Sequence, residues 1–357
     1  MSTARLLLLL RGNPMLMRNK LLSAVRRFAA GIDVSPREVR LVIASRRRRG
    51  GVPVRVEWLG AAPLAAGAMS GAHLVDRAAV AAALSSLCAR WPRRRAMRGM
   101  HCAMAVPGGT TAIATFEMPA AGPSARWRGG RPGTIDGLDE LEPAMLDEAE
   151  RLCGLERDAL SVDWWAGDCG VVPGAAAGDS AVQARPRVTL AAAPRLHLEA
   201  RVEVAAAAGI ALAAVDGEPS AALRALVYAA EHAPRPARRY AAIWAGYDGV
   251  YGWCVSEGAV DASVRFPGGE HADLELALRT LAENGALDYA LVGGDFGLLA
   301  RVGLTLADIG ERLGCGVAPF ECAPFCCGGV VPAKPTAWKH DASFAVAFGL
   351  ALRGVMQ

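Results

Sequence analysis

The sequence predicts an α/β protein in which two domains repeat one layout. Residues 31–44 hold an apolar run, a polar turn and a returning run of β-branched residues, which is the pattern of a β-hairpin. Residues 240–256 repeat this layout in the second half of the chain. The length of 357 residues suits two domains of ordinary size, and a content of 53% hydrophobic and 21% charged residues excludes a largely disordered chain.

The first half continues in the order expected of an α/β layer with a mixed sheet. Its further elements are a strand at 54–59, a helix at 75–87 and strands at 102–106 and 110–116. From Ala120 the chain becomes rich in Gly, Pro and Arg, which indicates an exposed loop over 120–136. After it come a helix at 138–152, strands at 161–166 and 187–192, and an Ala-rich helix at 196–208. We interpret this block as an inserted subdomain.

The second half repeats the α/β order with fewer residues. Its predicted elements are a strand at 210–215, a helix at 220–230, the second hairpin, a strand at 261–266, a helix at 274–283, a strand at 289–292, a short helix opened by Asp295 and a last helix at 341–353. The predicted domains are an N-terminal extension or short basic helix at 1–28, a first domain at 29–117, an inserted small α/β subdomain at 118–209, a return segment at 210–233, a reduced second domain at 234–340 and a closing helix at 341–357.

The N-terminal segment and the arginine clusters leave several readings open. The leucine run at 6–10 is too short to span a bilayer and lacks a signal-peptide cleavage site. Residues 15–30 have the spacing of a basic amphipathic helix, which would lie on a membrane, pack on the domain or precede a later start. Arginine runs at 46–49, 93–95 and 238–239 suit solvated faces better than nucleic acid or anionic lipid. Nine cysteines without a secretory signal favour reduced thiols in the cytosol.

Several short motifs follow one another in a specific order. They are Gly31-Ile-Asp33 with Arg40-Leu-Val, Phe116-Glu-Met-Pro119, Ser161-Val-Asp-Trp164, Val215-Asp-Gly-Glu-Pro219 and a closing Phe344-to-Arg353 segment. In this order the chain resembles the PilM family of type IV pilus assembly proteins, within the FtsA and actin-like ATPase superfamily, from about residue 29 to 354. The resemblance implies an α/β, actin-like (ribonuclease H-like) duplicated two-domain fold, with an inserted FtsA-like subdomain and a strongly shortened second-domain insertion.

The resemblance also implies a nucleotide site that has degenerated. By family match the cofactor-binding positions are Asp33, Ser35, Arg40, Gly246, Gly293 and Gly294, and the cofactor would be ATP with magnesium. Ser35-Pro36 replaces the family's Gly-Ser pair, so one backbone donor is lost. Trp244 stands where the family places an Asp, and Trp cannot coordinate an ion. We therefore expect no ATP hydrolysis and no catalytic residues, and Asp33 then serves as a turn cap or a residual nucleotide ligand.

No metal ligand set is predicted either. Cys315, Cys322, Cys326 and Cys327 lack the C-x-x-C spacing typical of zinc sites, and no two histidines stand in a metal-like pair.

By the same resemblance the chain would be a scaffold rather than an enzyme. It would lie in the cytoplasm at the inner face of the inner membrane and bind the cytoplasmic N-terminal peptide of a PilN-like membrane protein. PilO and pilus motor components are further candidate partners, and no specific nucleic acid is expected. The peptide groove would be walled by residues 102–106, 110–116, 161–166 and 196–208. The alternatives are an active actin-like ATPase that switches pilus assembly and an FtsA-like, filament-forming membrane protein.

Overall fold

Two five-stranded sheets with the same strand order form the body of the protein. The computed structural model describes residues 26–47, 53–92, 97, 99–117, 142–166, 187–234, 237–267, 271–326 and 342–356. The first sheet has the order β3-β2-β1-β6-β10 and the second the order β13-β12-β11-β14-β15. In each, three antiparallel strands are followed by two parallel ones. This repeated topology confirms the predicted duplicated, actin-like α/β fold.

The strands of the two sheets have the following bounds. The first sheet contains β1 (Arg26–Val34), β2 (Glu38–Arg47), β3 (Arg55–Pro63), β6 (His101–Val106) and β10 (Leu212–Gly217). The second contains β11 (Arg239–Gly246), β12 (Gly249–Ser256), β13 (Ala259–Pro267), β14 (Tyr289–Gly294) and β15 (Gly316–Pro319). A small hairpin of β4 (Met69–Ser70) and β5 (His73–Leu74) follows β3.

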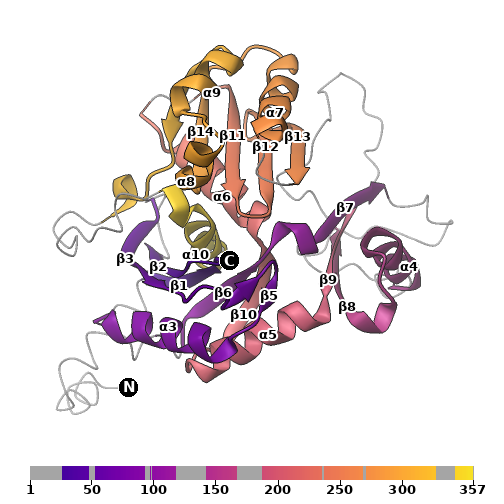
Figure 1. The fold of residues 1–357 in the computed structure, drawn as a ribbon, viewed down its shortest axis with the longest axis vertical. Coiled ribbons are helices and arrows are strands. Elements are labelled where there is room, and N and C mark those ends of the chain that lie inside the picture. Colours follow the sequence, from indigo (N-terminus) through magenta and orange to yellow (C-terminus); the bar gives the residue numbers. More distant parts are fainter. Residues whose placement is uncertain are drawn as a thin grey trace, which may run out of the picture.

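Two helices, α6 (Glu218–Glu231) and α10 (Ala345–Met356), lie between the sheets (Figure 1). In α10 every residue except Arg353 and Met356 is buried, as expected of a helix that is apolar on all sides. Its close approach to the sheet requires glycine, because a Cβ at Gly31 would overlap the carbonyl oxygen of Ala347. Gly31, part of the first sequence motif, is therefore a packing residue for α10.

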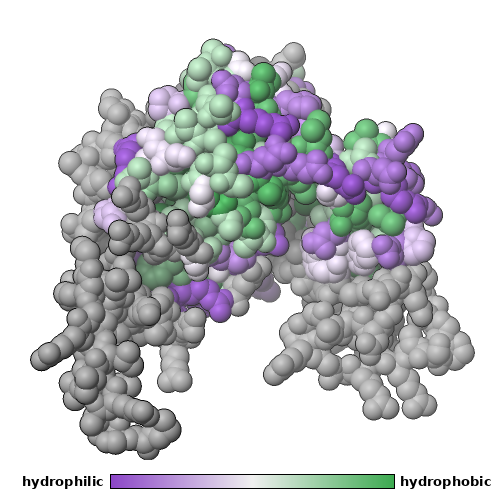
Figure 2. Space-filling view, turned by 90° about the horizontal axis from the view of Figure 1, so that it is seen from below, coloured by the Kyte–Doolittle hydropathy of each residue, from purple (hydrophilic) through white to green (hydrophobic). Residues whose placement is uncertain are grey.

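Other helices cover the outer faces of the sheets. On the first sheet these are α3 (Arg77–Arg90), capped by the Asp76 side chain, and α5 (Arg195–Ala207), joined across the surface by an Arg77–Glu203 ion pair. Hydrophilic and hydrophobic residues are interspersed over the face that is seen from below (Figure 2). The helices that cover the outer face of the second sheet are α7 (His271–Glu283), α8 (Phe296–Arg301) and α9 (Leu306–Leu313).

The inserted subdomain is a three-stranded sheet with one helix. The sheet has the order β7-β9-β8, formed by β7 (Ala112–Glu117), β8 (Leu160–Ala166) and β9 (Arg187–Pro194). The helix α4 (Glu142–Cys153) packs on one face, where Ala149 meets Leu160 and Leu190. The predicted limits 118–209 need correction at both ends. β7 pairs with β9 and so belongs to the insertion, whereas α5 buries Ala200 and Val204 against the first sheet.

The predicted helix at 15–30 is wrong from Arg26 onward, because β1 begins there. The Arg26 guanidinium donates to the Ser45 hydroxyl at 2.7 Å and lies 3.6 Å from Glu57, which fixes the strand start. Residues 1–25 and the predicted loop at 120–136 lie outside the described residues, as do Cys327 and most of the arginine runs. Within the described ranges, no helix is long and apolar enough to cross a membrane.

Candidate functional sites

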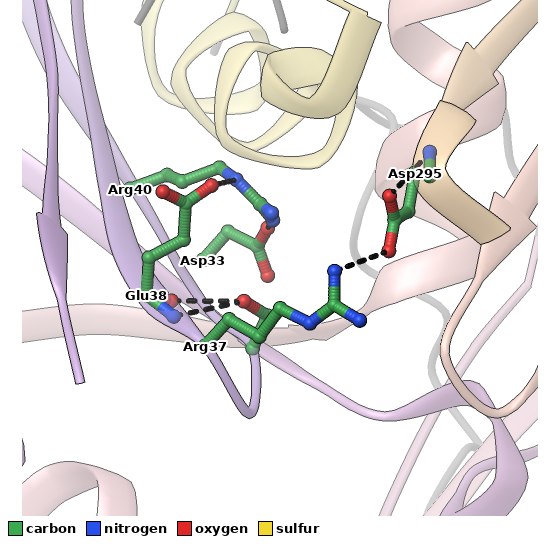
Figure 3. A network of polar contacts seen from close by, with 7 residues as sticks. Asp33, Arg37, Glu38, Arg40 and Asp295 are labelled. Atoms are coloured by element: carbon green, nitrogen blue, oxygen red, sulfur yellow. Dashed lines mark hydrogen bonds and ion pairs between the residues drawn. The ribbon is translucent and has the colours of Figure 1, made fainter. Parts of the chain in front are cut away.

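The first candidate site is the cleft where the hairpin turns of the two domains meet. Asp33, 3% exposed, accepts a 2.7 Å hydrogen bond from Arg40, and Arg40 donates a second one to Glu38 at 2.8 Å (Figure 3). The turn is capped by Ser35 instead, whose hydroxyl accepts from the Glu38 N–H and donates to the Glu38 carbonyl. Asp33 is therefore an ion-pair partner, and its interpretation as a turn cap is wrong.

The three predicted glycines of the second domain have packing roles. The Trp244 ring lies over Gly246, is 5% exposed and packs 5.4 Å from the Tyr251 ring, so it belongs to the core. Gly293 lies against the start of α10, where a Cβ would meet Ala345 at 3.2 Å. Gly294 has φ +108°, and an added Cβ would overlap the Ala245 carbonyl. The structure thus brings the predicted positions to one cleft but uses these three for close packing.

Each hairpin turn reaches the opposite domain. In the turn of the second hairpin, Asp248 accepts a 2.5 Å hydrogen bond from the backbone N–H of Gly109, which follows β6. Tyr247 donates its hydroxyl to the carbonyl of Gly71 at 3.3 Å. From the first hairpin, the Arg37 guanidinium lies 3.7 Å from the carboxylate of Asp295 (Figure 3). The sequence pattern predicts only a turn at residues 246–249 and gives no sign of this role of Asp248.

Several charged side chains near these contacts are buried. Glu218 at the start of α6 is 2% exposed, and its Oε2 has no hydrogen-bond partner among the described residues. Burial raises the pKa of Glu218 well above its usual value, and the nearby carboxylates of Asp33 and Asp248 raise it further. Burial also raises the pKa of Asp33, although Arg40 opposes the shift. Arg201, fully buried on α5, donates to the Ala105 carbonyl at 2.6 Å.

Several groups near the hairpin turns that could bind phosphate already have partners within the protein. Phosphate binding needs available backbone N–H groups and cations. Here the Gly109 N–H is used by Asp248, and Arg40 is used by Asp33 and Glu38. Arg201 is used by backbone carbonyls. Among the residues that the structure describes, no group of carboxylate, His or Cys side chains is arranged to hold a metal ion.

The second candidate site is a groove between the inserted sheet and the two main domains, with a volume of about 1460 Å³. Side chains alternate along a strand, so α4 covers one face of the inserted sheet and the other face opens into the groove. The open face consists of Thr111, Ile113, Thr115, Thr189, Ala191, Ala193, Ser161, Asp163 and Trp165. We refer to this space as the insertion groove.

All four predicted wall segments line the insertion groove. They contribute Val106, Ile113, Trp165 and Val202, among others. Besides β9 of the inserted sheet itself, sequence reasoning missed four walls: β10, α6, the end of α10, and the β12–β13 edge of the second domain. These segments come from remote parts of the sequence, and only the packing of α6 and α10 between the sheets brings them to the insertion.

The insertion groove combines apolar, charged and strand-edge features. Ile113 and Val202 are each 50% exposed. Asp216 accepts a hydrogen bond from Arg224 at 3.0 Å and forms an ion pair with Arg353 at 3.1 Å. Arg265 lies over the Tyr251 ring, 5.6 Å from its centroid. In the described sheets β7, β10 and β13 each pair with one strand only, so their other edges are open to pairing. An extended segment with apolar side chains fits such a surface.

These features define a two-domain, actin-like protein whose hairpin turns contact the opposite domain and whose inserted sheet opens into a groove. Its fold is that of one chain in a solved structure described as the PilM-PilN type IV pilus biogenesis complex. The TM-score is 0.66 at 18% sequence identity, over 92% of this chain and 98% of that chain.

Two further solved structures are similar over much of their length. The ethanolamine utilization protein EutJ from Carboxydothermus hydrogenoformans has a TM-score of 0.40 and 14% identity, over 91% of this chain and 89% of that chain. The cytoplasmic domain of EpsL, an inner membrane component of the type II secretion system of Vibrio cholerae, has a TM-score of 0.39 and 12% identity, over 74% and 81%. No protein-family model and no curated protein sequence matches this chain.

Proposed function

We propose that this chain is a PilM-like scaffold of a type IV pilus assembly platform. Its ligand is the cytoplasmic N-terminal peptide of a PilN-like inner-membrane protein, held in the insertion groove. The observation that carries the proposal is the open face of the inserted sheet, together with two half-exposed apolar side chains that line the same groove, Ile113 on β7 and Val202 on α5. A peptide there would bury these apolar side chains and pair with an open strand edge. The protein would then lie in the cytoplasm, at the inner face of the inner membrane, through its partner.

A matched pair of variants tests this proposal. Val202 lines the groove on α5, whereas Leu276 lies on α7 outside it, and both side chains are 50% exposed. Val202→Asp places a charge against the apolar peptide and should weaken its binding at least tenfold, while Leu276→Asp should bind like wild type. Isothermal titration with a synthetic N-terminal peptide of the PilN-like protein measures both. Equal binding by the two variants would place the peptide elsewhere and contradict the proposal.

The same proposal makes the chain a degenerate member of its fold class without ATPase activity. Support comes from Arg40 and the Gly109 N–H, which are already engaged within the protein. An ATP-driven switch and an FtsA-like filament are less well supported, because no contact described above favours either. Titration with ATP and magnesium, phosphate-release assays and sedimentation test these alternatives. PilO and motor components are candidate partners for co-purification with the PilN-like protein.

A further inference from the structure

The two hairpin turns make reciprocal contacts between the domains. Asp248 of the second domain accepts a hydrogen bond from the Gly109 N–H of the first domain. The Tyr247 hydroxyl of the second domain donates to the Gly71 carbonyl of the first domain. Arg37 approaches Asp295 in the opposite direction. We call these three contacts the latch. A carboxylate that accepts a backbone N–H forms a charge-assisted hydrogen bond, which is stronger than a neutral one.

The latch continues into the insertion groove through Tyr251. The Tyr251 hydroxyl donates to Asp248 at 3.2 Å, and its ring lies in the groove wall under Arg265. A Cβ added at Gly108 would overlap both the Tyr251 hydroxyl and the Pro219 ring, so Gly108 packs closely against both residues. Asp248 therefore touches both the first domain and a residue that lines the groove.

The groove wall is shared between the two domains. The first domain contributes Val106 and Pro219, and the second contributes Tyr251, Trp253 and Arg265. If the domains separated, the two halves of this wall would separate as well. A ligand that contacts both halves binds only the closed form, so its apparent affinity scales with the closed fraction.

We propose that Asp248 is a positioning residue that holds the two domains closed in place of a bound nucleotide, and so keeps the insertion groove formed at all times. The partner peptide, as identified under the proposed function, then contacts both domains and binds without ATP. The latch consists of contacts within this chain and does not depend on the identity of the partner.

The test uses three variants of the full chain. Asp248→Ala removes the acceptor, and Asp248→Asn keeps an acceptor oxygen without the charge. Asp288→Ala is the matched control, because Asp288 also accepts backbone N–H groups, from Arg238 and Arg239, but within the second domain. Hydrogen exchange of the Gly109 amide and small-angle scattering report domain opening, and titration of the PilN-like peptide reports the groove.

We expect Asp248→Ala to raise Gly109 exchange at least tenfold, to enlarge the radius of gyration and to weaken peptide binding about tenfold. Asp248→Asn should fall between it and wild type, and Asp288→Ala should match wild type in all three measurements. If Asp248→Ala matches Asp288→Ala in exchange and scattering, the latch does not hold the domains and the inference is wrong. If wild type fails to bind the peptide while exchange and scattering respond as expected, the proposed function fails and the latch stands.

Discussion

Replacing Glu218 with Gln should stabilise the protein increasingly as pH rises. The Glu218 carboxyl is buried near Asp33 and Asp248, and burial raises its pKa in the folded state. In the unfolded chain a Glu side chain has a pKa of about 4.3. Between these two pKa values the folded state binds more protons at this site than the unfolded state does, so the free energy of unfolding falls as pH increases. Gln carries no such proton.

The size of this stability difference follows from proton linkage, that is, from the number of protons that the folded and unfolded states bind. For one group, the free energy of unfolding of Glu218→Gln relative to wild type should grow by about 1.4 kcal/mol for each pH unit inside this window. Urea unfolding at pH 5, 6, 7 and 8 measures the difference. Glu231→Gln, an exposed change on the same helix, is the control. A difference that is constant across pH, or one that favours wild type increasingly at pH 8, would refute the assignment of Glu218 as a buried carboxyl with a raised pKa.

Two further predictions concern packing and buried charge. Gly31→Ala should destabilise the protein by about 3 kcal/mol, because its methyl group overlaps the backbone of α10, whereas Gly99→Ala, in open space, should be neutral in the same thermal unfolding assay. Arg201→Met should cost about 3 kcal/mol, because it leaves the Ala105 carbonyl without its donor and removes a positive charge near the buried Glu218. Arg195→Met on the exposed side of α5 is its control in urea unfolding, and equal midpoints would contradict the role given to Arg201.

Local pattern was sufficient to predict the hairpins and the duplicated fold. Alternation and a polar turn define a hairpin, and its register then places Asp33 opposite Arg40, an ion pair that sequence reasoning could have recognised. Similarly, Thr305 and Asp308 form a capping box at the start of α9, and this signal would have revealed a helix that was not predicted.

Contacts between residues far apart in the sequence could not be predicted from local patterns. The pattern of β7 is that of any half-exposed strand, and nothing local says that it joins the inserted sheet. Asp248 stands in an ordinary Gly-Tyr-Asp-Gly turn, and its role depends on Gly109, which lies in the other domain. The apolar pattern of α5 likewise gives no sign that Arg201 is fully buried among backbone carbonyls.

The most direct test of the scaffold is titration of the purified chain with the N-terminal peptide of the PilN-like protein, with and without ATP and magnesium. We expect saturable binding that is unchanged by ATP and is lost in Val202→Asp but kept in Leu276→Asp. Absence of peptide binding, or binding that strengthens markedly when ATP and magnesium are added, would contradict this expectation.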